Sequence, residues 1–167
     1  MKYSRRVEIF GQVRAKYAGF LASVLWKLTG DRELFAEAMQ YVLLGMWRNV
    51  EKLNGERSGA YIYRIALTAN SEAWRNRIGR DGQISQSQVG ADKDPREKAD
   101  KSELADIVRR VIAQLPAKQG RAVVMRYLEQ RSYQSIAEKL SCSEAGARSN
   151  VSKALANLKA KLGNLTV

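Results

Sequence analysis

The sequence predicts an all-α protein of two small helical domains joined by a flexible linker, the C-terminal one a helix-turn-helix. Apolar residues recur at intervals of three and four along most of the chain, which is the spacing of amphipathic helices. No strand-like alternation of useful length occurs. Between residues 79 and 102 the composition becomes polar and poor in aliphatic side chains, which separates a domain at 1–78 from one at 103–167.

Three helices are expected in the N-terminal domain. The first covers residues 3–28, and Gly30 suits its C-terminal cap. Asp31 can begin the second helix, because a side-chain carboxylate accepts hydrogen bonds from the free N–H groups of a first turn. A loop with two glycines at 54–59 ends the second helix, and a third helix is expected over 60–78.

The charge of the chain points to a polyanionic partner. The net charge is +12, with +6 in each domain and none in the linker. Nucleic acid is the partner that such a basic protein is most expected to bind, and an anionic membrane surface ranks second. No apolar run is long enough to span a membrane, and no signal peptide begins the chain, so we expect a cytoplasmic protein without membrane insertion.

The composition excludes most catalytic designs. The chain has no histidine and a single cysteine, Cys142, so disulfides, Ser-His or Cys-His pairs and thiolate or histidine zinc sites are excluded. Cys142 is interpreted as a packing residue, with a redox sensor as the alternative. A nucleic-acid enzyme using Mg²⁺ stays open, but acidic residues such as Glu37, Glu51 and Glu72 show no clustered spacing. We expect no cofactor and no enzymatic activity.

Four helices are expected after the linker. One ends before Pro116, a second runs from about 118 to 129, and residues 132–162 have the pattern of two helices joined by a tight turn. Ser132 and Ser143 are the expected N-caps of these last two helices. The apolar face of the first contains Tyr133, Ile136, Ala137 and Leu140.

The last helix has one face for packing and one for reading DNA. The packing face contains Ala147, Val151, Ala154, Leu155 and Leu158. The candidate DNA-binding residues are Arg148, Ser149, Asn150, Ser152 and Lys153. In a major groove arginine can contact guanine through two hydrogen bonds, and serine can contact several bases. The alternative is an ordinary helical hairpin with a solvated basic face.

A second candidate surface lies in the third helix. Positive charge along and beyond this helix comes from Arg64, Arg75, Arg77 and Arg80. The rings of Tyr61, Tyr63 and Trp74 are surfaces on which unpaired bases can stack. The alternative is that Tyr61 and Trp74 belong to the core, as we expect for Ile62 and Ile65.

This order of features resembles a divergent bacterial sigma factor of the extracytoplasmic-function type, over nearly the whole chain. Glu37, Gln40, Leu43 and Trp47 are similar to a family helix that docks on RNA polymerase. Residues 60–66, AYIYRIA, resemble the motif that opens the helix engaging the −10 promoter element, and 115–162 resemble the −35-reading domain. The chain differs from the family at Leu67-Thr68 and at Gly146-Ala147.

The resemblance implies a factor that binds core RNA polymerase and promoter DNA, and that can be held by an anti-sigma factor. It implies a region 2-like domain at 1–78, a linker at 79–102 and a region 4-like domain at 103–167. The polymerase-binding candidates are Glu37, Gln40, Leu44, Trp47 and Arg48. The −10 candidates are Tyr61, Tyr63, Arg64, Thr68, Arg75 and Arg77, and the −35 candidates are those of the last helix.

Two alternatives stay open. Trp47 can equally be an internal packing residue of the N-terminal domain. The whole chain can also be a helix-turn-helix regulator that binds duplex operator DNA without polymerase, with residues 1–78 as a dimerisation or effector domain.

Overall fold

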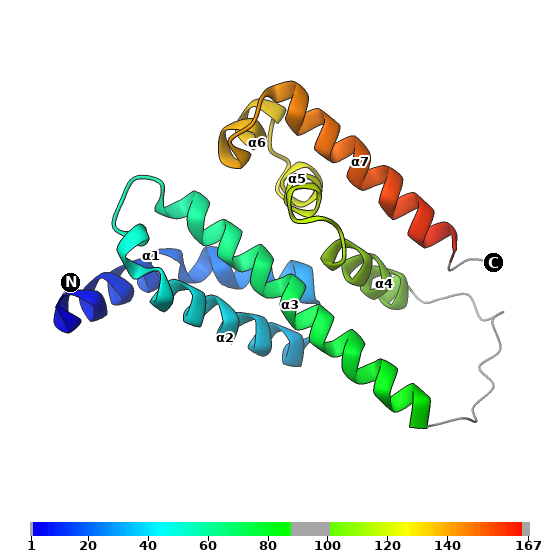
Figure 1. Cartoon of the computed structure of the whole chain (residues 1–167), viewed down its shortest axis with the longest axis horizontal. Helices are drawn as coiled ribbons and strands as arrows, with labels where there is room; N and C mark the ends of the chain where they lie inside the picture. Colours follow the sequence, from blue (N-terminus) through cyan, green and yellow to red (C-terminus); the bar gives the residue numbers. More distant parts are fainter. Residues whose placement is uncertain (1, 88–100, 165–167) are drawn as a thin grey trace.

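The computed structural model describes residues 2–87 and 101–164, and within them it contains only helices and their connections (Figure 1). The first unit consists of α1 (Tyr3–Thr29), α2 (Arg32–Arg48), the short 3-10 helix η1 (Val50–Leu53) and α3 (Ser58–Ser87). The second consists of α4 (Lys101–Ala113), α5 (Ala117–Tyr127), α6 (Tyr133–Leu140) and α7 (Glu144–Gly163). The all-α prediction with a C-terminal helix-turn-helix is confirmed.

The turn between α1 and α2 forms as its residues predict. Gly30 adopts a left-handed conformation, with φ of 61°, and its N–H donates to the carbonyl of Trp26. The carboxylate of Asp31 accepts a hydrogen bond of 2.9 Å from the backbone N–H of Leu34. These two caps set the direction in which α2 leaves α1.

Helices α1, α2 and α3 enclose the first hydrophobic core. Its fully buried members include Leu25, Leu34, Val42, Met46 and Ile62. At one point α2 and α3 approach so closely that only glycine fits: a Cβ atom at Gly45 would lie 2.8 Å from Cγ2 of Ile65. The absence of a side chain at position 45 therefore fixes how α2 lies against α3.

Helix α3 extends well beyond its predicted end. The linker was expected to begin at residue 79, but the helix continues to Ser87, and α4 already begins at Lys101. The rest of the predicted linker, 88–100, lies outside the described residues. The composition of 79–87 indicated correctly that little apolar surface is available, but a helix satisfies its own backbone hydrogen bonds and can continue into solvent.

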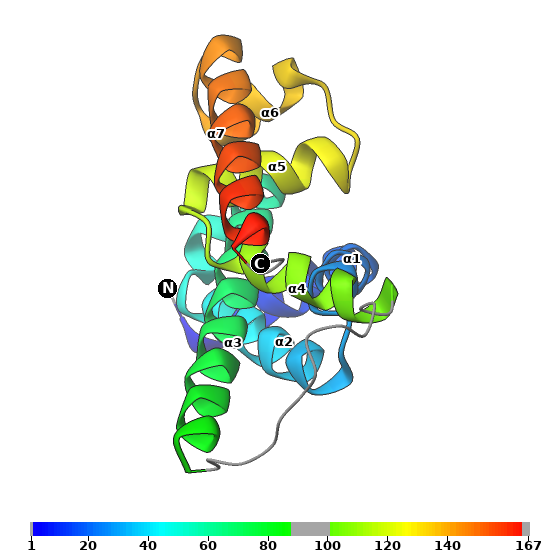
Figure 2. The same ribbon diagram turned by 90° about the vertical axis from the view of Figure 1, so that its right-hand side faces the viewer.

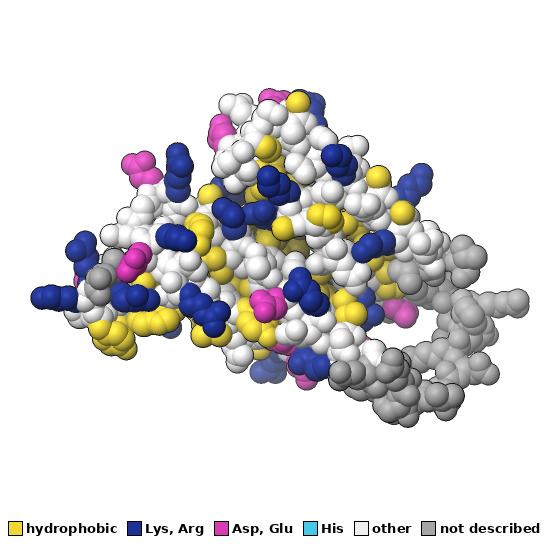
Figure 3. Space-filling view, viewed as in Figure 1, with side chains coloured by type: hydrophobic (Ala, Val, Ile, Leu, Met, Phe, Trp, Pro, Cys, Tyr) yellow, Lys and Arg dark blue, Asp and Glu magenta, His cyan; other side chains and the backbone are white. Residues whose placement is uncertain are grey.

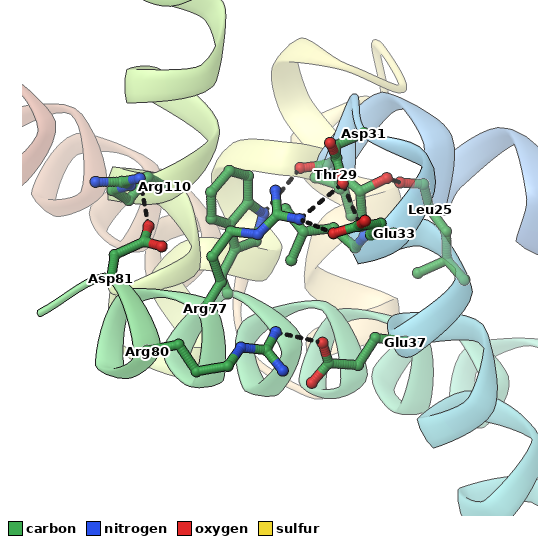
Figure 4. A network of polar contacts seen from close by, with 12 residues as sticks. Leu25, Thr29, Asp31, Glu33, Glu37, Arg77, Arg80, Asp81 and Arg110 are labelled. Atoms are coloured by element: carbon green, nitrogen blue, oxygen red, sulfur yellow. Dashed lines mark hydrogen bonds and ion pairs between the residues drawn. The ribbon is translucent and has the colours of Figure 1, made fainter. Parts of the chain in front are cut away.

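Ion pairs tie this end of α3 to its neighbours (Figure 4). The guanidinium of Arg77 contacts Asp31 at 2.9 Å, and that of Arg80 contacts Glu37 of α2 at 2.9 Å. Asp81 lies 3.4 Å from a guanidinium nitrogen of Arg110, on α4. These pairs are partly exposed, and we regard them as positional constraints rather than as a large source of stability.

The two units share a second hydrophobic core. Residues of α5, α6 and α7 pack there against Val24 and Leu28 of α1 and against Tyr63 and Leu67 of α3. The buried members from α5–α7 include Ala122, Val123, Val124, Met125, Ile136, Ala147 and Val151. Arg109 of α4 also donates to the carbonyl of Lys27, at 2.9 Å. The second unit thus lies directly against α1 and α3 (Figures 1 and 2).

Candidate nucleic-acid interface

Helices α6 and α7 are placed by two serine caps. The hydroxyl of Ser132 accepts from the N–H of Ser135, and that of Ser143 accepts from the N–H of Gly146, at 3.2 and 3.0 Å. Ser141 ends α6 in a left-handed conformation, with φ of 52°. A Cβ at position 146 would lie 3.2 Å from the hydroxyl of Ser143, so glycine here leaves room for the cap.

The two faces of α7 separate as expected. Ala147, Val151 and Ala154 are buried in the second core, whereas Arg148, Ser149, Ser152 and Lys153 are exposed. Asn150 is half-buried, and its side-chain amide donates to the carbonyl of Gly146 at 2.9 Å. One of the two N–H groups of its amide is therefore used within the helix.

Leu155 was expected on the packing face of α7, and this was wrong, because the side chain is 41% exposed. At about 100° per residue it lies roughly 40° beyond Val151, at the edge of the buried stripe, where neighbouring helices no longer cover it. Leu158 is half-buried against the second core, as expected.

Arg148 is held in place by two side chains. Its Nη2 lies 2.5 Å from Oε1 of Glu144, one helical turn earlier, and its Cζ lies 4.6 Å from the ring centroid of Tyr133. The spacing of Glu144 and Arg148 is the i, i+4 spacing of a helical ion pair and could have been recognised in the sequence. The contact with Tyr133 was missed, because the sequence assigned that ring only to the packing face of α6.

A row of polar side chains runs along the exposed side of α3. Arg64, Thr68, Glu72 and Arg75 are all exposed, at spacings that place them on one face of the helix. A groove of about 410 Å³ lies between this row and α2. Tyr61 lines the groove, and its hydroxyl donates to Oδ1 of Asn49 at 2.9 Å.

Two of the aromatic rings expected on this surface are buried. Trp74 is 3% exposed and its indole N–H donates to the carbonyl of Leu28, which favours the core alternative for this ring. Tyr63 is 2% exposed and lies in the core that the two units share. In this arrangement the ring does not reach solvent. Its assignment to the −10 element stays a prediction.

The surroundings of Tyr63 are polar at one point. Within the described part of the chain, neither the hydroxyl of Tyr63 nor Oε1 of Glu129 has a hydrogen-bond partner. Burial, and then the nearby carboxylate of Glu129, raise the pKa of the Tyr63 phenol far above its usual value. The phenol is thus neutral, and its hydroxyl lies close to the carboxylate of Glu129.

Positive charge gathers where the two units meet. Arg64, Arg75 and Arg121 form no ion pair with any carboxylate of the described residues. Burial, and then the charge of Arg64, lower the pKa of Arg121, which the sequence had not singled out. Arg77, by contrast, is engaged by Asp31 and Glu33. Lys and Arg side chains predominate over acidic ones on the face seen in Figure 3.

The outer face of α2 presents three of the expected polymerase-binding residues. Gln40, Leu44 and Arg48 are exposed and follow one another at intervals of four, which places them in one row. Leu44 is 49% exposed and is the apolar member of this row.

The two other candidates on α2 have internal partners. The half-buried ring of Trp47 meets those of Tyr3 and Phe10 edge-on, at 6.0 and 5.5 Å, which favours the packing interpretation. The carboxylate of Glu37 accepts hydrogen bonds from Arg80, Asn76 and Tyr41. Its desolvation raises the pKa of Glu37, but these bonds outweigh it and the pKa is lowered.

In residues 2–82 and 103–164, no three acidic or cysteine side chains come together as metal ligands. No helix in the same ranges is long and apolar enough to cross a membrane. Cys142 is half-buried beside the second core, as expected of a packing residue.

Comparison with known proteins links both units to one family. Residues 14–78 match the family model described as Sigma-70 region 2, and residues 105–158 match Sigma-70, region 4. The fold is similar to that of the sigma factor RpoE in a co-crystal structure with the anti-sigma factor NepR from Bartonella quintana. That likeness has a TM-score of 0.50 at 19% identity and covers 92% of this chain and 96% of the other. No protein of curated function matches.

Proposed function

This chain belongs to the sigma-70 family, as a sigma factor of the extracytoplasmic-function type, and we propose from this membership which of its surfaces perform the family's binding steps. It binds core RNA polymerase and directs promoter-specific transcription initiation. A regulator that acts without polymerase is not favoured, because residues 14–78 match a sigma region rather than a dimerisation or effector domain.

The row formed by Gln40, Leu44 and Arg48 is the proposed polymerase contact. It combines the exposed Leu44 with the polar Gln40 and with Arg48, a residue type that is enriched in protein interfaces. Trp47 lies at the rim of this row, and its role is to hold α1 against α2 through Tyr3 and Phe10.

The exposed face of α7 is the proposed −35 reader. The observation that carries this role is the separation of its two faces: Arg148, Ser149, Ser152 and Lys153 point away from a helix whose opposite side is buried. A helix presented in this way can enter a major groove with its N-terminal residues toward the bases.

The exposed row of α3 is the proposed −10 surface. Arg64 and Arg75 supply charge for phosphates, Thr68 lies between them, and Tyr61 supplies an aromatic ring beside the same groove. Tyr63 can join this surface only when α5–α7 move away from α3, because its side chain is now buried in the shared core. Promoter binding by Tyr63 therefore requires the two units to separate.

The proposal also covers where the protein acts and what restrains it. Polymerase and promoter DNA are in the bacterial cytoplasm, and we place its action there. The Bartonella relative was crystallised with an anti-sigma factor. We propose that a protein of that kind can also hold this chain, since the two folds are alike.

The test is reconstitution with purified bacterial core polymerase. The wild-type protein should co-elute with core polymerase in gel filtration and support transcription from a cognate promoter. The double variant Gln40→Ala, Leu44→Ala should bind core polymerase more weakly, whereas Arg14→Ala, an exposed change on α1, should not. Failure of the wild-type chain to bind core polymerase would overturn the proposed function, and equal binding by the double variant would remove α2 from it.

A further inference from the structure

Tyr133 lies where the three helices α5, α6 and α7 meet. It is the first residue of α6, and the Ser132 cap fixes its backbone. The ring is half-buried and packs against the second core. Two guanidinium groups lie over it: Cζ of Arg126, on α5, is 4.7 Å from the ring centroid, and Cζ of Arg148, on α7, is 4.6 Å away. Both distances are within the range of cation–π attraction.

The two arginines are not equivalent. Nη1 of Arg126 donates to the carbonyl of Arg131 at 2.9 Å, so Arg126 is tied to the connection between α5 and α6. Arg148 is exposed, and its one bond within the described residues joins Nη2 to Glu144. The other N–H groups of Arg148, including the second one on Nη2, therefore stay available, so one edge of the guanidinium can still donate two parallel hydrogen bonds to a ligand. Cation–π attraction to the Tyr133 ring, 4.6 Å from Cζ, restricts the guanidinium plane.

Holding that plane matters for reading a base. Two parallel hydrogen bonds to a guanine require the guanidinium to approach edge-on, in the plane of the base. A free arginine side chain samples many rotamers, and ordering it on binding weakens the complex. A ring that orders Arg148 before binding reduces this loss of side-chain entropy. The gain in affinity is largest for a base that accepts two hydrogen bonds from the guanidinium at once.

We propose that Tyr133 is a positioning residue for −35 recognition: its ring face orients Arg148 toward one base pair and so increases discrimination at that position. This inference rests on the proposed role of α7 as the −35 reader. It assigns to Tyr133 no contact with DNA and no role for its hydroxyl. The ring face acts, so phenylalanine can replace tyrosine here, whereas an aliphatic side chain cannot.

The experiment measures binding of the reconstituted holoenzyme to a panel of −35 duplexes in which each base pair is changed in turn. The variants are Arg148→Ala, Tyr133→Phe, Tyr133→Leu, and the double variant Arg148→Ala, Tyr133→Leu. A further protein carries pentafluorophenylalanine at position 133, which keeps the shape of the ring but removes the negative charge of its face. Thermal unfolding of each variant is measured alongside, and the fluorinated ring replaces Tyr133→Leu if the leucine variant does not fold.

The readout is the ratio of affinities for the preferred and the changed base pair. Arg148→Ala should lower this ratio at one position, by about fivefold or more. Tyr133→Leu and the fluorinated ring should lower it about two- to fivefold at the same position, whereas Tyr133→Phe should change it less than twofold. The salt dependence should not change, because no phosphate contact is lost. In the Arg148→Ala background, Tyr133→Leu should have no further effect on the ratio.

Three results would overturn the positioning role. The first is an unchanged ratio with Tyr133→Leu and the fluorinated ring. The second is an equal loss of affinity for every duplex, which would mean that Tyr133 acts on the fold or on phosphates. The third is an effect of Tyr133→Leu that persists without Arg148. If Arg148→Ala itself leaves every ratio unchanged, then Arg148 is not the reader, and the proposed −35 role and this inference fail together.

Discussion

The core that joins the two units predicts a large effect of the substitution Leu67→Ala. Leu67 is 7% exposed and belongs to the same cluster as Leu28 of α1 and Leu115, which follows α4. Replacing a buried leucine by alanine costs about 2–5 kcal/mol, from lost burial and the cavity left behind. For a chain of this length each kcal/mol lowers the melting temperature by about 2–4 °C, so a drop of about 4–20 °C is expected.

The assay is thermal unfolding followed by far-ultraviolet circular dichroism, with Leu155→Ala as the matched control. Leu155 is 41% exposed, so its loss should cost no more than about 0.5 kcal/mol. Small-angle X-ray scattering of Leu67→Arg supplies a second measure, because a buried guanidinium without a partner should force α5–α7 away from α3 and increase the radius of gyration. Equal melting temperatures for Leu67→Ala and Leu155→Ala, with no expansion of Leu67→Arg, would refute a shared core in solution.

Three further predictions concern single surfaces. Arg148→Ala should cost about 1–3 kcal/mol on the preferred −35 sequence alone, whereas Lys153→Ala should weaken all duplexes alike and reduce the salt slope by about one; fluorescence anisotropy of holoenzyme on labelled duplexes separates the two. Leu44→Ala should lower polymerase affinity without lowering the melting temperature. Trp47→Ala should mainly lower the melting temperature. The opposite pattern, a lower melting temperature for Leu44→Ala and a lower affinity alone for Trp47→Ala, would exchange their roles. The N–H of Leu34, and then Arg77, lower the pKa of Asp31 below 3.8, so the stability that its ionised form supplies is present above that pH and is lost as the pH falls through the lower folded value. Asp31→Asn keeps a capping side chain, and its unfolding should therefore depend less on pH below about 4 than that of the wild type.

Local features of the sequence were sufficient to predict the turn between α1 and α2 and most of the two faces of α7. Gly30 and Asp31 end and begin helices through contacts within four residues, so a reader of the sequence needs no tertiary information. The same holds for the centre of each face of α7, which follows from the helical repeat, but not for Leu155, which lies at the edge of the buried stripe.

Features that depend on contacts between residues far apart in the chain could not be predicted from the sequence. Trp74 and Tyr63 have aromatic rings of the kind that stack on bases, but whether such a ring is buried depends on which helix lies over it. Arg77 forms an ion pair with Asp31, 46 residues earlier, and no periodicity relates the two. Tyr133 has an apolar ring that suits a core, and only the position of α7 reveals that the ring also faces Arg148.

The close approach of α2 and α3 at Gly45 has a consequence for how the factor is used. The proposed polymerase row lies on α2 and the proposed −10 row on α3, and a contact too tight for a single methyl group separates the two helices. A larger residue at position 45 would require Ile65 or one of the two helices to shift, and a shift of a helix would move one row relative to the other without touching polymerase or DNA. With the two rows used as proposed, docking of α2 on polymerase would also set the orientation of the α3 row, and a substitution at position 45 should impair promoter opening rather than assembly with polymerase.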